Sequence, residues 1–91
     1  MIIGLEEARK FLRVDYIDDD ELISGLIKTA DELCREITRQ DEETFDEDSD
    51  IIRAAALYVV SYLYDNRNNP DYRKLKLNLR AMMSGIRKGA F

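Results

Sequence analysis

The positions of apolar and polar residues along the chain predict four helices. The clearest is the second, because its apolar residues recur at steps of three and four, which is the spacing of one stripe along a helix. The stripe consists of Leu22, Ile23, Leu26, Ile27, Ala30, Leu33, Cys34 and Ile37. Asp18, followed three residues later by Glu21, approximates a capping box at its start. We therefore expect this helix over residues 18–39.

Shorter patterns of the same kind predict the first and the fourth helix. The apolar positions are Leu5, Ala8, Phe11 and Leu12 in the first, and Leu75, Leu79, Met82, Met83 and Ile86 in the fourth. Glu6 and Glu7 lie in the first turn of the first helix, where the helix dipole favours anions. Pro70 disfavours helix at the residue before it, so the turn cluster around it separates the third helix from the fourth. We expect these helices over residues 5–13 and 74–88.

The third predicted helix, over residues 49–67, is apolar nearly all round. Asp48, Ser49 and Asp50 offer N-cap chemistry at its start. Its first stripe carries large apolar residues, and its second face is mixed, formed by Arg53, Leu57, Val60, Ser61 and Tyr64. A helix of this kind must be covered all round. Either the other helices surround it within one bundle, or a neighbouring chain covers its second face.

These elements predict an all-α fold, a small bundle of four helices with an acidic loop at 40–48. Phe45 is the only large apolar residue of that loop. Ninety-one residues suit one hydrophobic core, so we expect a single domain over residues 1–91. The longest apolar stretch is too short to span a bilayer, and the N-terminus does not resemble a signal peptide. With one cysteine, Cys34, the chain fits a reducing compartment, and we expect synthesis in the cytosol without membrane contact.

Charge is distributed unevenly along the chain. The net charge is −5, but residues 1–65 hold 7 basic and 18 acidic side chains, net −11, whereas residues 66–91 hold 7 basic and 1 acidic, net +6. This polarity has two interpretations. The two signs are solvated faces, or complementary potentials bring an acidic surface of one copy, or of another partner, to the basic segment.

The residues present argue against catalysis and against a metal site. The chain has no histidine, which removes Ser-His and Cys-His nucleophile arrangements, and its carboxylates lie in polar segments where nothing raises a pKa. The acidic loop lacks the glycine and the ligand spacing of a calcium loop. We expect no enzyme activity and no cofactor. Two binding roles remain as alternatives, a nucleic-acid regulator acting through the basic fourth helix and a generic helical protein-interaction module.

Three separate segments share the order and spacing of one known family. They are Gly4 to Asp15 followed by Asp18 to Ile27, then Tyr64-Asp65-Asn66-Arg67, and finally Met82 to Arg87. Together they resemble the head-tail connector proteins of tailed bacteriophages and prophages. The chain departs from that family at Ile86, where an aromatic residue is frequent, and in its Lys-rich stretch before the last helix.

The resemblance implies a structural adaptor of the virion neck, assembled in the host cytoplasm. Copies would form a ring beneath the portal protein, extend the DNA channel and present a platform for a stopper or tail protein, with DNA only as cargo. For contacts between subunits we predict Arg53, Leu57, Tyr64 and Arg67. For contacts with partner proteins we predict the basic residues Arg73, Lys74, Lys76, Arg80, Arg87 and Lys88.

Overall fold

A computed structural model describes residues 2–14, 19–40 and 49–83. Its elements are α1 (Leu5–Leu12), α2 (Asp20–Gln40), α3 (Asp50–Asp65) and α4 (Tyr72–Met83). The described residues contain no strand, so the predicted all-α class and the four helices are confirmed. Gln40, expected in the acidic loop, is the last residue of α2 instead. The capping residue Asp18, the loop at 41–48 with Phe45, and the expected turns at 84–88 lie outside the described residues.

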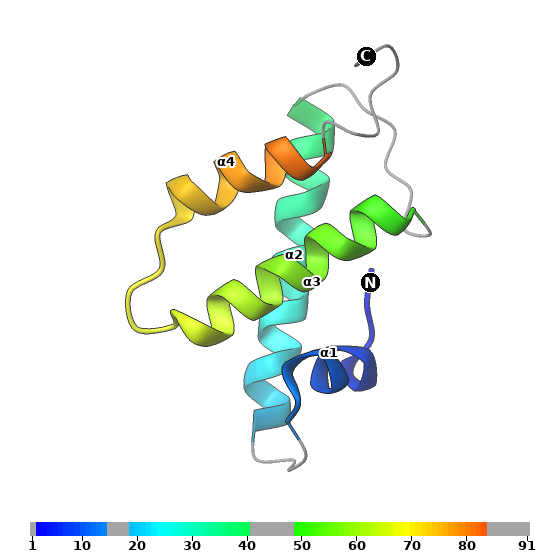
Figure 1. Ribbon diagram of the computed structural model, residues 1–91, viewed down its shortest axis with the longest axis vertical. Coiled ribbons are helices and arrows are strands. Elements are labelled where there is room, and N and C mark those ends of the chain that lie inside the picture. Colours follow the sequence, from blue (N-terminus) through cyan, green and yellow to red (C-terminus); the bar gives the residue numbers. More distant parts are fainter. Residues whose placement is uncertain (1, 15–18, 41–48, 84–91) are drawn as a thin grey trace.

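Helix α3 crosses α2, whereas α4 runs back beside α3 in a nearly antiparallel direction (Figure 1). Figure 1 shows α2 along the long axis of the molecule, with α3 crossing it in front, α1 beside the start of α2 and α4 beside its end. An ion pair of 3.6 Å between Lys76 Nζ and Glu36 Oε2 joins α4 to the C-terminal half of α2. The central crossing of α2 and α3 therefore leaves α1 and α4 on opposite sides of α3.

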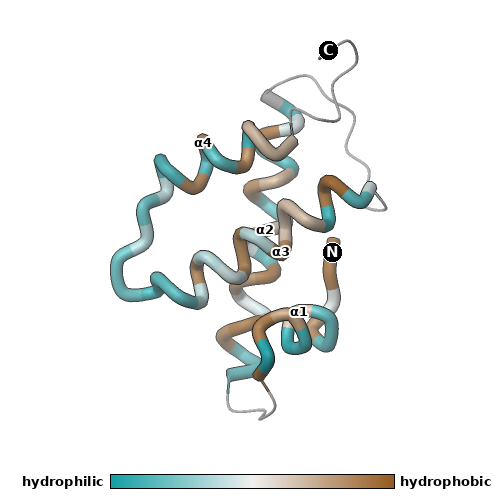
Figure 2. The backbone as a smooth tube through the Cα atoms, in the orientation of Figure 1, coloured by the Kyte–Doolittle hydropathy of each residue, from teal (hydrophilic) through white to brown (hydrophobic). Residues whose placement is uncertain are grey.

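The hydrophobic core is built around α3. Side chains of all four helices and of the N-terminal segment form one buried cluster. The contribution of α3 is the largest in relation to its length, consisting of Ile52, Ala55, Ala56, Val59, Val60 and Leu63. Val60, which the sequence places on the second face, is thus fully buried. The connection between α3 and α4 is hydrophilic, in agreement with its place at the surface (Figure 2).

Local hydrogen bonds decide where α3 and α4 begin and end. The Ser49 hydroxyl accepts a bond of 3.4 Å from the Ile52 backbone N–H and starts α3. The backbone and side-chain N–H groups of Asn66 both donate to the Tyr62 carbonyl, at 2.9 Å, so α3 ends two residues before the predicted boundary. The Asp71 carboxylate accepts from the Lys74 backbone N–H at 3.1 Å, and this cap starts α4 two residues early.

A left-handed residue terminates α1. Arg13 has φ 61° and ψ 42°, a conformation that costs an L-residue roughly 1–2 kcal/mol relative to glycine. The bonds of this turn run from the Arg13 N–H to the Lys10 carbonyl at 3.2 Å and from the Val14 N–H to the Arg9 carbonyl at 3.0 Å. The turn redirects the chain from α1 toward α2.

Replacing this residue by glycine tests the turn. We expect Arg13→Gly to raise the free energy of unfolding by about 0.5–1 kcal/mol, because relief of the left-handed conformation exceeds the added entropy of the unfolded chain. Urea denaturation followed by circular dichroism measures the change. The matched control is Lys10→Gly, inside α1 and exposed, which should lower stability by about 1 kcal/mol. If both variants are destabilised equally, Arg13 does not bear this conformational cost.

Candidate functional site

Arg53, predicted at a subunit contact, binds within its own chain. Its Nη1 donates to the Ile2 carbonyl at 2.8 Å, and its Nη2 donates to Glu7 Oε1 at 2.5 Å. Ile2 and Ile3 lie buried in the core just before α1. Arg53 therefore holds the N-terminal segment and α1 against the start of α3, and its role between subunits stays a prediction.

Tyr64 and Arg67 contact each other at the end of α3. The Tyr64 hydroxyl donates to Asp19 Oδ2 at 2.6 Å, which joins α3 to the start of α2. Arg67 Nη1 donates to the Tyr64 carbonyl at 2.9 Å, and its guanidinium carbon lies 5.0 Å from the centre of the Tyr64 ring, a cation–π distance. Together with the Asn66 cap, these contacts show that the Tyr64 to Arg67 motif stabilises the C-terminal end of α3.

The fourth predicted subunit residue, Leu57, lies one turn after Arg53 and two turns before Tyr64, on the same flank of α3. Its side chain is half-buried and packs against the edge of the core. Of the four predicted residues, Arg67 is exposed, whereas Arg53, Leu57 and Tyr64 are half-buried. The structure does not bring the four into one compact patch.

The predicted basic segment is partly described. Arg73, Lys74 and Arg80 are exposed on α4, a helix without any acidic residue, whereas Lys76 is half-buried and paired with Glu36. The remaining members, Arg87 and Lys88, lie outside the described residues. The described part of the segment is a helix with a basic outer surface.

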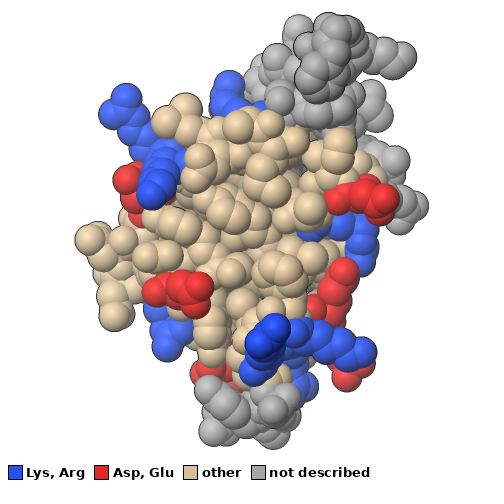
Figure 3. All heavy atoms as spheres, viewed as in Figure 1, with Lys and Arg blue, Asp and Glu red and all other residues tan. Residues whose placement is uncertain are grey.

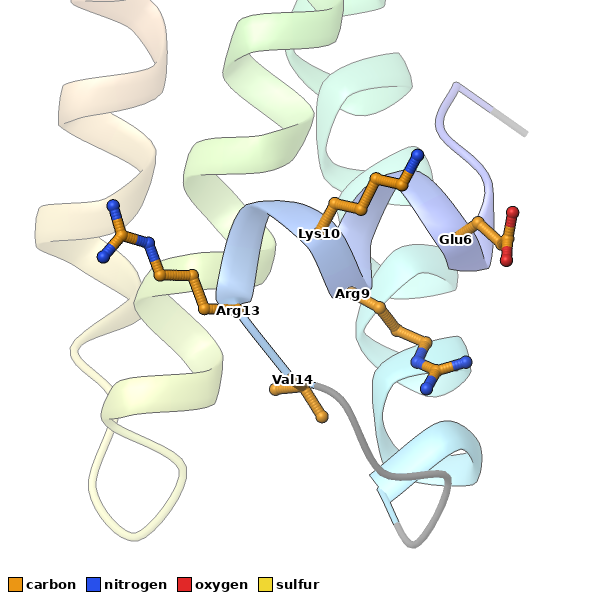
Figure 4. Close-up of a pocket in the computed structure, with 5 residues that line it drawn as sticks. All are labelled: Glu6, Arg9, Lys10, Arg13 and Val14. Atoms are coloured by element: carbon orange, nitrogen blue, oxygen red, sulfur yellow. The ribbon is translucent and has the colours of Figure 1, made fainter.

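A hollow beside α1 is lined by charged side chains that do not converge. Its lining residues are Glu6, Arg9, Lys10, Arg13 and Val14. Figure 4 shows that Arg13 points to the opposite side from Arg9 and Glu6. Lys10 points away from Arg9 and from Arg13. Arg9 Nε lies 3.5 Å from Asp20 Oδ1. The cations do not point to one place, and Arg9 already lies beside Asp20. This hollow is therefore not arranged to hold a small anion.

One uncharged surface was missed by the sequence patterns. Tyr58 and Tyr62, on the side of α3 that faces α4, have ring centres 6.2 Å apart. The Tyr58 hydroxyl accepts from Asn78 Nδ2 at 2.8 Å, and the Tyr62 hydroxyl accepts from the Asp71 backbone N–H at 3.0 Å. These bonds join α3 and α4 into one continuous surface, on which Leu77 is 60% exposed. Leu77 falls outside the apolar stripe of its helix. This position off the stripe is the only feature of the sequence that could have indicated an exposed apolar side chain.

Metal and membrane sites were sought over the same described ranges. No group of three or more potential ligand side chains gathers there. Nor does any helix of residues 2–14, 19–40 and 49–83 have the length and apolar character to cross a membrane. Cys34 is buried in α2, where desolvation, followed by the nearby charge of Asp31, raises the pKa of its thiol to about 12.

Removing the Arg53 guanidinium tests its role within the chain. We expect Arg53→Met to lower the free energy of unfolding by about 1–2 kcal/mol, because the Ile2 carbonyl loses its donor and Glu7 its cation at a half-exposed site. Thermal and urea unfolding measure the loss. A double-mutant cycle with Glu7→Gln separates the ion pair from the bond to Ile2. A stability equal to that of the wild type would show that these bonds contribute nothing.

The buried thiol predicts a pH dependence. In the folded state Cys34 should resist alkylation by iodoacetamide at pH 9, where an unfolded thiol is largely ionised. Since the folded pKa lies above the unfolded one, the contribution of Cys34 to stability is complete below about pH 8.5 and is lost as the pH rises toward 12. Mass spectrometry with and without urea measures the labelling. Rapid labelling without urea would contradict the burial of this thiol.

The comparison with known proteins identifies one family. The model of the phage gp6-like head-tail connector proteins matches residues 2–83. No curated protein and no solved structure matches the chain. The match covers all four helices, including the Tyr64 to Arg67 motif, and that family is structural and not enzymatic. The chain therefore belongs to the phage gp6-like head-tail connector family.

Proposed function

We propose that this protein is the adaptor that joins a phage head to its tail as a single connector domain. Copies form a ring beneath the portal protein, extend the DNA channel and give the stopper or tail protein its platform. The observation that carries the proposal is the family match over residues 2–83. DNA passes through the ring as cargo, and the protein is a component of the virion neck after assembly in the host cytoplasm.

The charge distribution supports assembly through complementary surfaces. A chain with net −11 in residues 1–65 and net +6 in residues 66–91 has two unlike surfaces to offer, which suits head-to-tail contacts that close into a ring. In this proposal Leu57 and Arg67, with Arg53 and Tyr64 beside them, face a neighbouring subunit. The basic residues Arg73, Lys74, Lys76, Arg80, Arg87 and Lys88 face a partner protein.

Nucleic-acid regulation is the weaker function for this chain. A helix that reads or grips DNA presents hydrogen-bond donors along its outer face, because most such contacts go to phosphates. The outer face of α4 places the exposed Leu77 between Arg73 and Arg80. An apolar side chain at that position suits a protein surface better than a phosphate backbone.

Complementation of a phage that lacks this gene tests the adaptor role. Wild-type protein should restore tailed particles, and Arg87→Glu with Lys88→Glu should lower their yield at least tenfold, because two cations are reversed at the partner contact. Electron microscopy counts tailed and tailless heads. The control reverses Lys28 and Arg39, which are exposed on α2.

The outcomes separate the role from the residues assigned to it. Failure of the wild-type gene to restore tails, with the protein expressed and folded, would overturn the adaptor function. Normal yield from the Arg87 and Lys88 variant would overturn only the partner contact assigned to these residues.

A further inference from the structure

A broad uncharged surface lies over the middle of α3 beside α4, and of the four predicted subunit residues it includes Leu57 alone. In the view of Figure 3, the middle of the molecule, where α3 crosses α2, carries no charged atoms, while Lys, Arg, Asp and Glu atoms surround it. Eleven consecutive residues of α3, from Ala54 to Tyr64, are uncharged. The surface, called here the α3/α4 face, consists of Ala54, Leu57, Tyr58, Ser61, Leu77 and Ala81.

We propose that a second copy of the chain docks on the α3/α4 face. The inference rests on the proposed function and deepens it, because it moves the subunit contact from Arg53 and Tyr64 to the open side of α3. Those two side chains already bind Glu7 and Asp19 within their own chain. The opposite side of α3 has no such intrachain charge partners to give up on docking.

The shape of the face suits close packing. Ala54 and Ser61 project from α3 two turns apart, and both are small enough to let another backbone approach. Leu77 and Ala81 lie one turn apart on α4 and are exposed. The α3 part of the face is thus low and uncharged, and Arg73, Lys74 and Arg80 lie within about one turn of Leu77 at its α4 edge. An uncharged centre therefore adjoins a basic edge, as the dry centre of a protein interface adjoins its polar rim.

The tyrosines make the face rigid before any partner arrives. The hydroxyls of Tyr58 and Tyr62 are held by Asn78 and by the Asp71 backbone, at 2.8 and 3.0 Å. Each hydroxyl would therefore keep the hydrogen bond that it accepts when the face is buried. Few side chains of the face would lose further conformational freedom on docking. Rings fixed in this way add contact area at a low cost in entropy.

The charges around the face select its occupant. Arg73, Lys74 and Arg80 are exposed along α4, beside the face, and α4 has no acidic residue. An occupant should therefore be acidic around its contact area. The chain itself supplies acidic side chains, since residues 1–65 carry net −11, and Glu21 and Glu32 are exposed on α2. A contact between unlike surfaces of two copies is heterologous, and repetition of such a contact can close a ring.

Two substitutions in the face and one outside it test the proposal. Ala54→Arg places a long side chain where the small Ala54 would let another backbone approach, and Leu77→Asp places an anion where an acidic occupant approaches. Ser24→Arg is the matched control, at an exposed position on the outer side of α2. Circular dichroism verifies that each variant folds. Sedimentation velocity over a range of protein concentrations, at low and high salt, then measures self-association.

We expect the wild type and Ser24→Arg to self-associate alike, and more weakly as salt increases. Ala54→Arg and Leu77→Asp should each weaken association at least tenfold, and negative-stain microscopy should show fewer closed rings. Equal association of both face variants and the wild type would overturn the proposal. So would a wild type that stays monomeric at all concentrations and both salt levels.

Other occupants have distinct outcomes. If both face variants form normal rings but lose attachment to the portal in complementation, another neck protein occupies the face, and the self-contact is wrong while the adaptor function stands. If a short DNA duplex binds the wild type and binds Leu77→Lys more tightly, the occupant is nucleic acid, and the proposal is overturned. If the wild-type gene fails to restore tailed particles in complementation, the proposed function is contradicted, whatever occupies this face.

Discussion

The crossing of α2 and α3 is the packing on which the rest of the structure depends. The buried side of α3 is apolar over six residues and meets the stripe of α2 from Ile23 to Ile37. At roughly 25 cal/mol per Å² of apolar area removed from water, this contact is the main source of stability available to so short a chain. The two remaining helices are too short to be stable alone, and each forms by packing against this pair.

The polar contacts follow from the geometry of that crossing. Once α3 lies across α2, its two flanks meet different neighbours. One flank holds Arg53 and Tyr64, which bind the N-terminal segment, α1 and the start of α2. The other holds Tyr58 and Tyr62, whose hydroxyls receive hydrogen bonds from α4 and the turn before it. The flanks are thus used within the chain, and the outward side of α3 carries the small residues Ala54 and Ser61.

This division fits the part of a connector subunit. A ring subunit needs a stable fold of its own and a surface that is finished before assembly, because loose side chains would have to be ordered on docking. Here the polar groups next to the uncharged face are already paired, and the charged residues lie around it.

The sequence by itself determined the helices, their order and the family. Periodicity in α2 and the nearly continuous apolar run of α3 depend on local spacing, which the chain shows directly. Helix boundaries were within two residues wherever the structure describes them. The differences at the end of α3 and the start of α4 came from caps at Asn66 and Asp71, whose side chains could have bonded in several ways.

Only the tertiary structure decided which of the predicted contact residues bind within their own chain. Arg53 and Tyr64 are of residue types that are common at interfaces. Their partners within the chain, Glu7 and Asp19, are more than forty positions away in the sequence. Leu77 lay off the stripe of its own helix, and its exposure depends on where α3 and α2 sit around α4. Pairings across such separations are set by how helices cross, and the crossing is not encoded in the spacing of any single helix.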